Sequence, residues 1–164
     1  IRTHSHKLLF VTLERDRSIS CGAFGDYLIK FIAPGENKEP IESAGEIKRQ
    51  DWIEWAEAAW SYRDLRETDT LNVAAGRGED DTKHICPLQL GVVDRLVRLY
   101  SNPGDIVFSP FAGIGSEGYM ALKHGRRFYG CEIKPEYQAA AITNLNRALE
   151  LSKQSQNSLF AGQS

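Results

Sequence analysis

Residues 106–132 read IVFSPFAGIGSEGYMALKHGRRFYGCE, and this stretch decides the fold. It predicts a short apolar strand, a glycine-rich turn, a helix, and a second strand closed by Glu132. Glycines let the backbone turn tightly and approach a ligand, while a helix N-terminus presents free N–H groups. A carboxylate at the tip of the second strand can accept hydrogen bonds from both ribose hydroxyls. The spacing from Gly113 to Glu132, about twenty residues, is typical of a nucleotide-binding β-α-β unit.

Further elements are predicted on both sides of this unit. Apolar residues at helical spacing predict a helix that Pro87 opens and that reaches Tyr100. A turn follows at residues 102–105. After Glu132, an alanine-rich helix is expected from Pro135 to about Leu151, with a frayed polar tail from Ser152. The order of elements predicts an α/β fold with a mostly parallel sheet.

The first half of the chain carries weaker signals. Residues 26–32 read as a strand, closed by a turn at Pro34 and Gly35. The three tryptophans, Trp52, Trp55 and Trp60, recur at roughly helical spacing. They predict either a helix packed on the core or a surface that contacts DNA or a neighbouring domain. Residues 61–83 are polar and read as a long loop.

The composition excludes several classes of protein. No apolar run is long enough to cross a bilayer, so no membrane partner is expected. Cys21, Cys86 and Cys131 form no CxxC pair, which argues against a disulfide framework or a zinc site and favours a cytoplasmic location. No metal is predicted. Because the chain begins with Ile1 and its only methionine is Met120, we expect a piece of a longer protein.

Two cofactor classes fit the glycine-rich turn. Gly113, Gly115 and Gly118 match the dinucleotide fingerprint, so a nicotinamide-dependent oxidoreductase is one interpretation. Three features favour S-adenosylmethionine instead. Phe111 precedes the glycines, the helix at 87–100 directly precedes the first strand, and one further helix leaves no room for a second mononucleotide half.

Four stretches, residues 83–90, 101–105, 109–116 and 127–137, resemble the C-terminal half of DNA N6-adenine/N4-cytosine methyltransferases. The resemblance is closest to phage-type and prophage-type members, in which the cofactor motifs follow the catalytic motif. It is specific over residues 83–150 and weaker before them.

The resemblance implies a Rossmann-like methyltransferase sheet with helices on both faces, N-terminally truncated in this chain. Residues 1–82 would be the remainder of the catalytic half with a linking or recognition segment. Residues 83–151 would be the unit that binds S-adenosylmethionine, and residues 152–164 a flexible tail.

The resemblance also implies a set of cofactor contacts. Phe111 and the glycines after it would line the methionine and adenosine side, Glu132 would hold the ribose, and Ile133 would lie beside the adenine. Residues 84–87 would close over the methionine end, although Cys86 also reads as packed core and His84 as a helix cap. Ser109 stands where the family usually has aspartate, which predicts that one cofactor contact is replaced or lost. The full set is His84, Ile85, Cys86, Pro87, Ser109, Pro110, Phe111, Ala112, Gly113, Gly115, Ser116, Glu132 and Ile133.

The family's catalytic motif, a polar residue followed by Pro-Pro and an aromatic residue, does not occur in the chain, whose prolines are all isolated. The resemblance places that motif upstream of Ile1, so no catalytic residue is assigned and this chain alone is expected to be inactive. The intact enzyme would methylate double-stranded DNA in a bacterial or phage-infected cell. A methyltransferase acting on RNA or a small molecule is an alternative, and an exposed sheet edge favours a homodimer.

Overall fold

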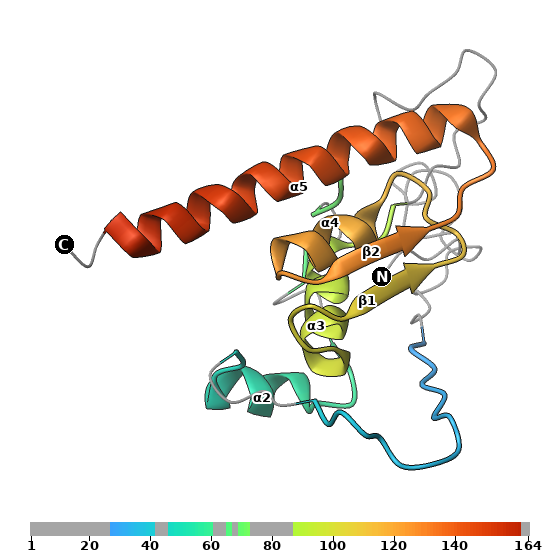
Figure 1. Cartoon of the computed structure of the whole chain (residues 1–164). Helices are drawn as coiled ribbons and strands as arrows, with labels where there is room; N and C mark the ends of the chain where they lie inside the picture. The colour runs from blue at the N-terminus through green and yellow to red at the C-terminus, as the bar shows by residue number, and fades with distance from the viewer. Residues whose placement is uncertain (1–26, 42–45, 61–64, 67–68, 73–86, 162–164) are drawn as a thin grey trace, which may run out of the picture. The chain divides into compact units, whose positions relative to one another are not determined.

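The computed structural model describes residues 27–41, 46–60, 65–66, 69–72 and 87–161, with side chains up to position 154 (Figure 1). The chain divides into two units, Ile1–Lys38 and Glu39–Ser164. The helices and strands of the described residues all lie in the second unit.

Two parallel strands form the sheet of the second unit. Strand β1 (Ile106–Ser109) and strand β2 (Arg127–Gly130) run side by side in the same direction (Figure 1). Helix α4 (Ser116–Lys123) connects them. The register pairs Ser109 with Gly130, so both strands end at the same edge. The predicted strand–helix–strand unit is therefore confirmed.

The predicted end of the second strand is wrong by two residues. Strand β2 stops at Gly130, because the backbone then leaves the sheet to join the glycine-rich turn. The N–H of Cys131 donates to the Ser109 carbonyl at 2.9 Å, and the Cys131 carbonyl accepts from the N–H of Ala112 at 2.8 Å. Glu132 therefore lies beyond the strand, next to the turn.

Helix α4 packs on one face of this sheet. Gly118 allows the close approach, because a Cβ atom there would lie 2.5 Å from the ring of Phe128. On the opposite face, the stacked rings of Phe108 and Tyr129 are 56% and 66% exposed. The sequence predicts helices on both faces, and the described residues place α4 on one of them.

Helix α3 (Leu90–Tyr100) precedes the sheet. It begins at Leu90 rather than at Pro87, since the N–H groups of Val92 and Val93 turn back to the carbonyl of Gln89. The predicted apolar side of α3 faces the core. The buried apolar cluster consists of Leu71, Leu90, Val93, Val97, Ile114, Met120 and Ala140.

Helix α5 (Pro135–Ala161) follows β2 and packs on α4 through small side chains, with Ala140 and Ala141 buried. The prediction that this helix ends near Leu151 is wrong. No glycine or proline interrupts residues 136–161, so nothing in the sequence forces the helix to stop at Ser152. Figure 1 shows the C-terminal half of α5 extending beyond α4.

Helix α2 (Arg49–Trp55) contains two of the three tryptophans. The guanidinium carbon of Arg95, on α3, lies 5.5 Å from the ring centre of Trp55 and 5.0 Å from that of Trp60. Both rings thus contact Arg95, but no residue of α2 is buried and Trp52 is 53% exposed, so the packed-helix and surface-contact interpretations both stay predictions. The helix ends before Trp60, which lies on the segment that follows.

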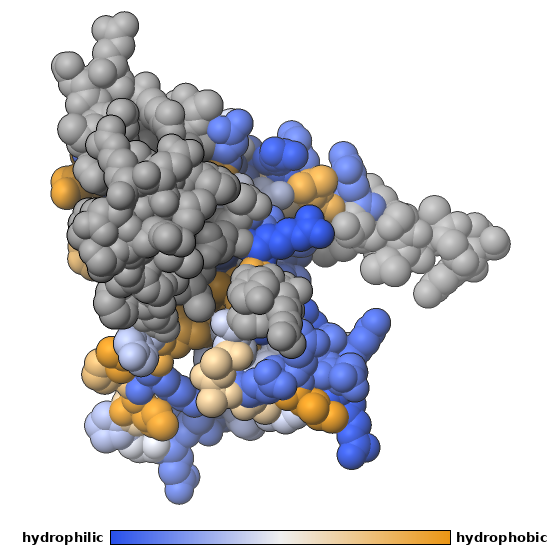
Figure 2. Space-filling model, turned by 180° about the vertical axis from the view of Figure 1, so that it is seen from behind, coloured by the Kyte–Doolittle hydropathy of each residue, from blue (hydrophilic) through white to orange (hydrophobic). Residues whose placement is uncertain are grey.

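The strand predicted over residues 26–32 is wrong within the described residues. Residues 27–33 form no regular structure, and the chain bends at Pro34 and Gly35 as predicted. Tyr27, Phe31 and Ile32 are each more than 80% exposed. Figure 2 shows apolar residues, coloured orange, on the surface of the molecule. A strand needs a hydrogen-bonded neighbour as well as an apolar pattern, and the described sheet contains only β1 and β2.

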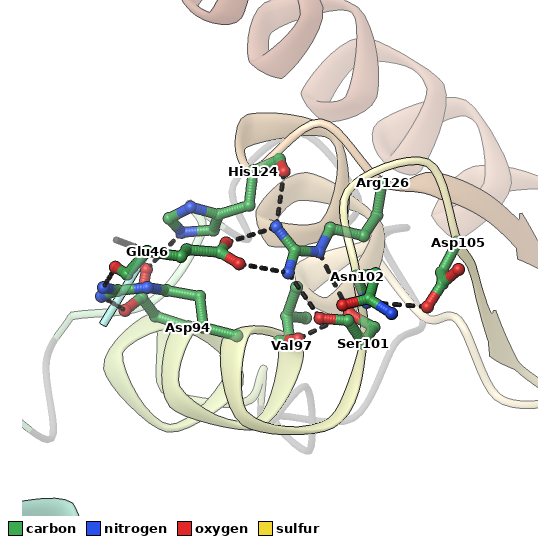
Figure 3. Close-up of polar contacts among 9 residues, drawn as sticks. Glu46, Asp94, Val97, Ser101, Asn102, Asp105, His124 and Arg126 are labelled. Carbon is green, nitrogen blue, oxygen red and sulfur yellow. Dashed lines mark hydrogen bonds and ion pairs between the residues drawn. The ribbon is translucent and has the colours of Figure 1, made fainter. Parts of the chain in front are cut away.

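Arg126 joins four segments at the end of the sheet opposite the glycine-rich turn (Figure 3). Its buried guanidinium donates to both carboxylate oxygens of Glu46, one of them at 2.9 Å. It also donates to the hydroxyl and the carbonyl of Ser101, at 3.1 and 2.6 Å, and to the carbonyl of His124 at 2.7 Å. Removing one partner of a buried ion pair destabilises the folded chain, because the other charge is left buried without compensation.

Replacing Arg126 with methionine should lower the free energy of unfolding by about 3 kcal/mol, because it removes the cation from a half-buried carboxylate and the donor from two carbonyls. Urea denaturation would measure this loss. The control is Arg127→Met, since the side chain of Arg127 is exposed and donates to the Gly104 carbonyl at 2.9 Å. Equal losses in both variants would contradict the role assigned to Arg126.

Asp94 links α3 to the end of α4. Its carboxylate lies 2.5 Å from Nε2 of His124 and 3.4 Å from Arg98 (Figure 3). Burial by itself raises the pKa of Asp94, but the hydrogen bond and charge of His124, together with Arg98, outweigh burial and lower the pKa below its ordinary value. The ionised carboxylate is therefore favoured in the folded chain.

Because the folded pKa of Asp94 is lowered, its stabilising effect is present at neutral pH and is lost as pH falls through the folded pKa. The variant Asp94→Asn should unfold more easily than the wild type at pH 7. That difference should shrink as pH is lowered below about 5. Urea denaturation at a series of pH values measures it, with the exposed Glu150→Gln variant as control. A difference that stays constant down to pH 3 would contradict this account.

Candidate ligand-binding site

A pocket of about 320 Å³ opens at the carboxyl ends of β1 and β2. Its volume falls in the range of small-molecule sites, about 300–1,000 Å³. In parallel α/β sheets ligands bind at this edge. The lining residues are Pro87, Leu88, Phe111, Ala112, Gly113, Ile114, Ser116, Glu117, Glu132, Ile133, Lys134 and Tyr137.

The glycine-rich turn forms one wall of the pocket. Gly113 and Gly115 have φ angles of +54° and +85°, in the left-handed region that side chains other than glycine rarely adopt. The N–H of Gly115 donates to the Ala112 carbonyl at 2.8 Å, and α4 begins at the next residue. The turn therefore brings backbone atoms, rather than side chains, up to the pocket.

Glu132 lines the pocket next to the turn and is hydrogen-bonded to it. Its carboxylate accepts the N–H of Gly113 at 2.8 Å and the N–H of Lys134 at 2.9 Å. A carboxylate has about four lone-pair positions, so further donors can still bind. A direct hydrogen bond, which the sequence did not predict, therefore joins the two residues whose spacing indicated a nucleotide-binding unit.

Apolar side chains around the mouth of the pocket are unusually accessible. Phe111 is 86% exposed and Ile133 is 97% exposed, while Leu88 is 48% exposed. Exposed apolar groups beside a pocket with a few fixed polar groups are typical of sites that hold a flat, partly apolar ligand.

A second carboxylate was not predicted from the sequence. Glu117 lies in the first turn of α4 and lines the pocket. The buried hydroxyl of Ser109 donates to its Oε1 at 3.1 Å. The signal available in the sequence was an acidic residue in the first turn of the predicted helix, eight residues after Ser109.

The pocket brings together seven of the predicted residues: Pro87, Phe111, Ala112, Gly113, Ser116, Glu132 and Ile133. Ser109 and Gly115 are buried and are not among the lining residues, and Pro110 is exposed outside the lining. His84, Ile85 and Cys86 lie outside the described residues. The cofactor contacts assigned to all of these residues stay predictions.

The described residues contain no group of three or more acidic, histidine or cysteine side chains that could hold a metal ion. Among them there is also no helix with the length and apolar character that a membrane span requires.

A glycine-rich turn, a following helix and an acidic residue at the ends of parallel strands define a Rossmann-like binding domain. The chain belongs to the N6/N4 DNA methylase family, whose model matches residues 26–143, more than half of its length. The family prediction is thereby confirmed.

Individual relatives match parts of the chain. The Type II methyltransferase M1.MboII of Moraxella bovis is 39% identical over 88 residues, covering 54% of this chain and 32% of the relative. The DNA adenine methyltransferase YhdJ of Escherichia coli K12 is 42% identical over 57 residues, covering 35% and 19%. The chain thus spans a third or less of these relatives.

A solved structure agrees with this assignment. A DNA modification methylase of Thermus thermophilus, crystallised with S-adenosyl-L-methionine, superposes with a TM-score of 0.51 at 27% sequence identity. The match covers 71% of this chain and 41% of that one. The predicted fold class, a Rossmann-like methyltransferase sheet, is confirmed.

Proposed function

We propose that this chain is the S-adenosylmethionine-binding part of a DNA methyltransferase that modifies the exocyclic amine of adenine (N6) or cytosine (N4). The observation that carries the proposal is the hydrogen bond from Gly113 to Glu132, at a pocket on the carboxyl edge of a parallel sheet. Membership of the N6/N4 DNA methylase family supports both the cofactor and the substrate class.

The pocket residues fit this cofactor chemically. Glu132 would accept the ribose hydroxyls, since its carboxylate has acceptor positions beyond the two that Gly113 and Lys134 use. The exposed Phe111 and Ile133 would contact the adenine and the apolar part of the methionine chain. Pro87 and Leu88, just before α3, would close the methionine end.

Charge separates this cofactor from a dinucleotide. In dinucleotide enzymes the pyrophosphate sits at the N-terminus of the helix that follows the glycine turn. Here the carboxylate of Glu117 occupies the first turn of that helix and lines the pocket. A carboxylate repels a pyrophosphate and attracts a cation. S-adenosylmethionine has no phosphate and bears a sulfonium and an ammonium group, so it suits this wall better.

The methyl transfer itself would need residues outside this chain. A base flipped out of the duplex would present its amine to the sulfonium methyl group. Positioning of the two reactants would supply much of the catalysis, and no covalent enzyme intermediate or metal would be needed. The chain contains no Pro-Pro pair, so the residues that hold the base are proposed to lie in the remainder of a longer protein. A homodimer, a cytoplasmic location and a phage origin stay predictions.

Calorimetric titration of the chain should show binding of S-adenosylhomocysteine and none of NAD at the same concentrations. Glu132→Gln should weaken S-adenosylhomocysteine about tenfold, because it replaces a charged hydrogen-bond acceptor with a neutral one. The control is Glu136→Gln, an exposed glutamate on α5 outside the pocket. Binding of NAD with no binding of S-adenosylhomocysteine would make the cofactor assignment wrong.

Transfer of a radiolabelled methyl group to double-stranded DNA tests the substrate. The longer protein that contains this sequence should label DNA at adenine N6 or cytosine N4, whereas the 164-residue chain alone should not. RNA of the same sequence is the control substrate. Labelling of RNA but not of DNA would contradict the proposed substrate class.

A further inference from the structure

Glu117 is a charged pocket residue that the family resemblance did not single out. It lines the pocket from the first turn of α4, and its side chain is held by a hydrogen bond from Ser109. Ser109 is only 6% exposed, so this donor is buried. This bond uses one of the roughly four acceptor positions of the carboxylate, and the others remain able to bind a ligand.

The pair Ser109 and Glu117 also explains a departure from the family pattern. The family resemblance leads us to expect an aspartate at the position of Ser109, which is the last residue of β1. In this chain the negative charge is carried instead by Glu117, eight residues later, and the serine hydroxyl connects the two positions at 3.1 Å. The pocket thus has a carboxylate on the helix, bonded to the residue at the end of the strand.

On the basis of the proposed function, we infer that Glu117 binds the ammonium group of the cofactor's methionine portion, in place of the aspartate that the resemblance leads us to expect at position 109. The sulfonium has no N–H or O–H to donate, and Glu132 is the carboxylate placed for the ribose. The ammonium group combines full positive charge with three donors, which is the combination that a fixed carboxylate binds most strongly.

The simpler account is that Glu117 only stabilises the start of α4 through the helix dipole and its bond to Ser109. The two accounts differ in what they predict for ligands. A structural role affects all ligands of the pocket equally, whereas an ammonium contact affects only ligands that carry that group.

A cycle of two proteins and two ligands separates these accounts. The proteins are the wild-type chain and Glu117→Gln, which keeps an oxygen to accept the Ser109 hydroxyl. The ligands are S-adenosylhomocysteine and its deaminated analogue, which lacks only the ammonium group. The wild type should prefer S-adenosylhomocysteine by a factor on the order of 10 to 100, the value of one charge-assisted hydrogen bond. Glu117→Gln should show almost no preference.

Two further variants sharpen the test. Glu136→Gln, the first-turn glutamate of α5, should keep the wild-type preference. The double variant Ser109→Asp, Glu117→Gln returns the charge to the end of β1 and should regain most of the preference. This rescue keeps the inference testable even if Glu117→Gln alone folds poorly.

Each outcome has a distinct meaning. If the wild type binds no S-adenosylhomocysteine, the proposed cofactor function fails. If it binds both ligands equally, or if Glu117→Gln keeps the full preference, the cofactor function stands and the ammonium contact is overturned. Equal weakening of both ligands by Glu117→Gln would assign Glu117 a structural role only.

Discussion

The parallel pairing of β1 and β2 is the constraint on which the site depends. The register sets Ser109 opposite Gly130, and the Cys131 N–H extends the pairing by one hydrogen bond to the Ser109 carbonyl. Both strands must therefore end at the same edge of the sheet. The glycine-rich turn, which follows β1, and Glu132, which follows β2, both lie at that edge. The hydrogen bond from Gly113 to Glu132 joins them. A shift in register would separate the turn from the carboxylate.

What could be predicted from the sequence was local or had a fixed spacing. The strand–helix–strand unit is such a case, because its glycines and Glu132 are separated by a distance that the fold itself requires. The apolar side of α3 is another, since helical periodicity marks Leu90, Val93 and Val97 directly. Element ends were less well predicted, as the start of α3 and the end of α5 show.

The unpredicted features depend on contacts between distant residues. Arg126 bonds to Glu46, eighty positions earlier, and no local pattern indicates such a partner. From the sequence, Glu117 is only an acidic residue in the first turn of a predicted helix. Its place in the pocket depends on which side of α4 faces the pocket and on the hydrogen bond from the Ser109 hydroxyl. The strand predicted at residues 26–32 failed for a related reason: a sequence pattern indicates propensity but not whether a neighbouring strand is present.

The same glycine spacing serves two cofactor classes, so the glycines alone cannot select the ligand. They provide backbone conformation and close packing, as Gly118 does against Phe128, and both cofactors need these equally. Selection must come from the charge beside the turn. A bare helix N-terminus favours a phosphate, whereas the carboxylate of Glu117 in the first turn of α4 makes that position unfavourable for an anion and favourable for a cation. The charge of this side chain is thus one physical reason why the pocket suits a cationic cofactor better than a phosphate-bearing one.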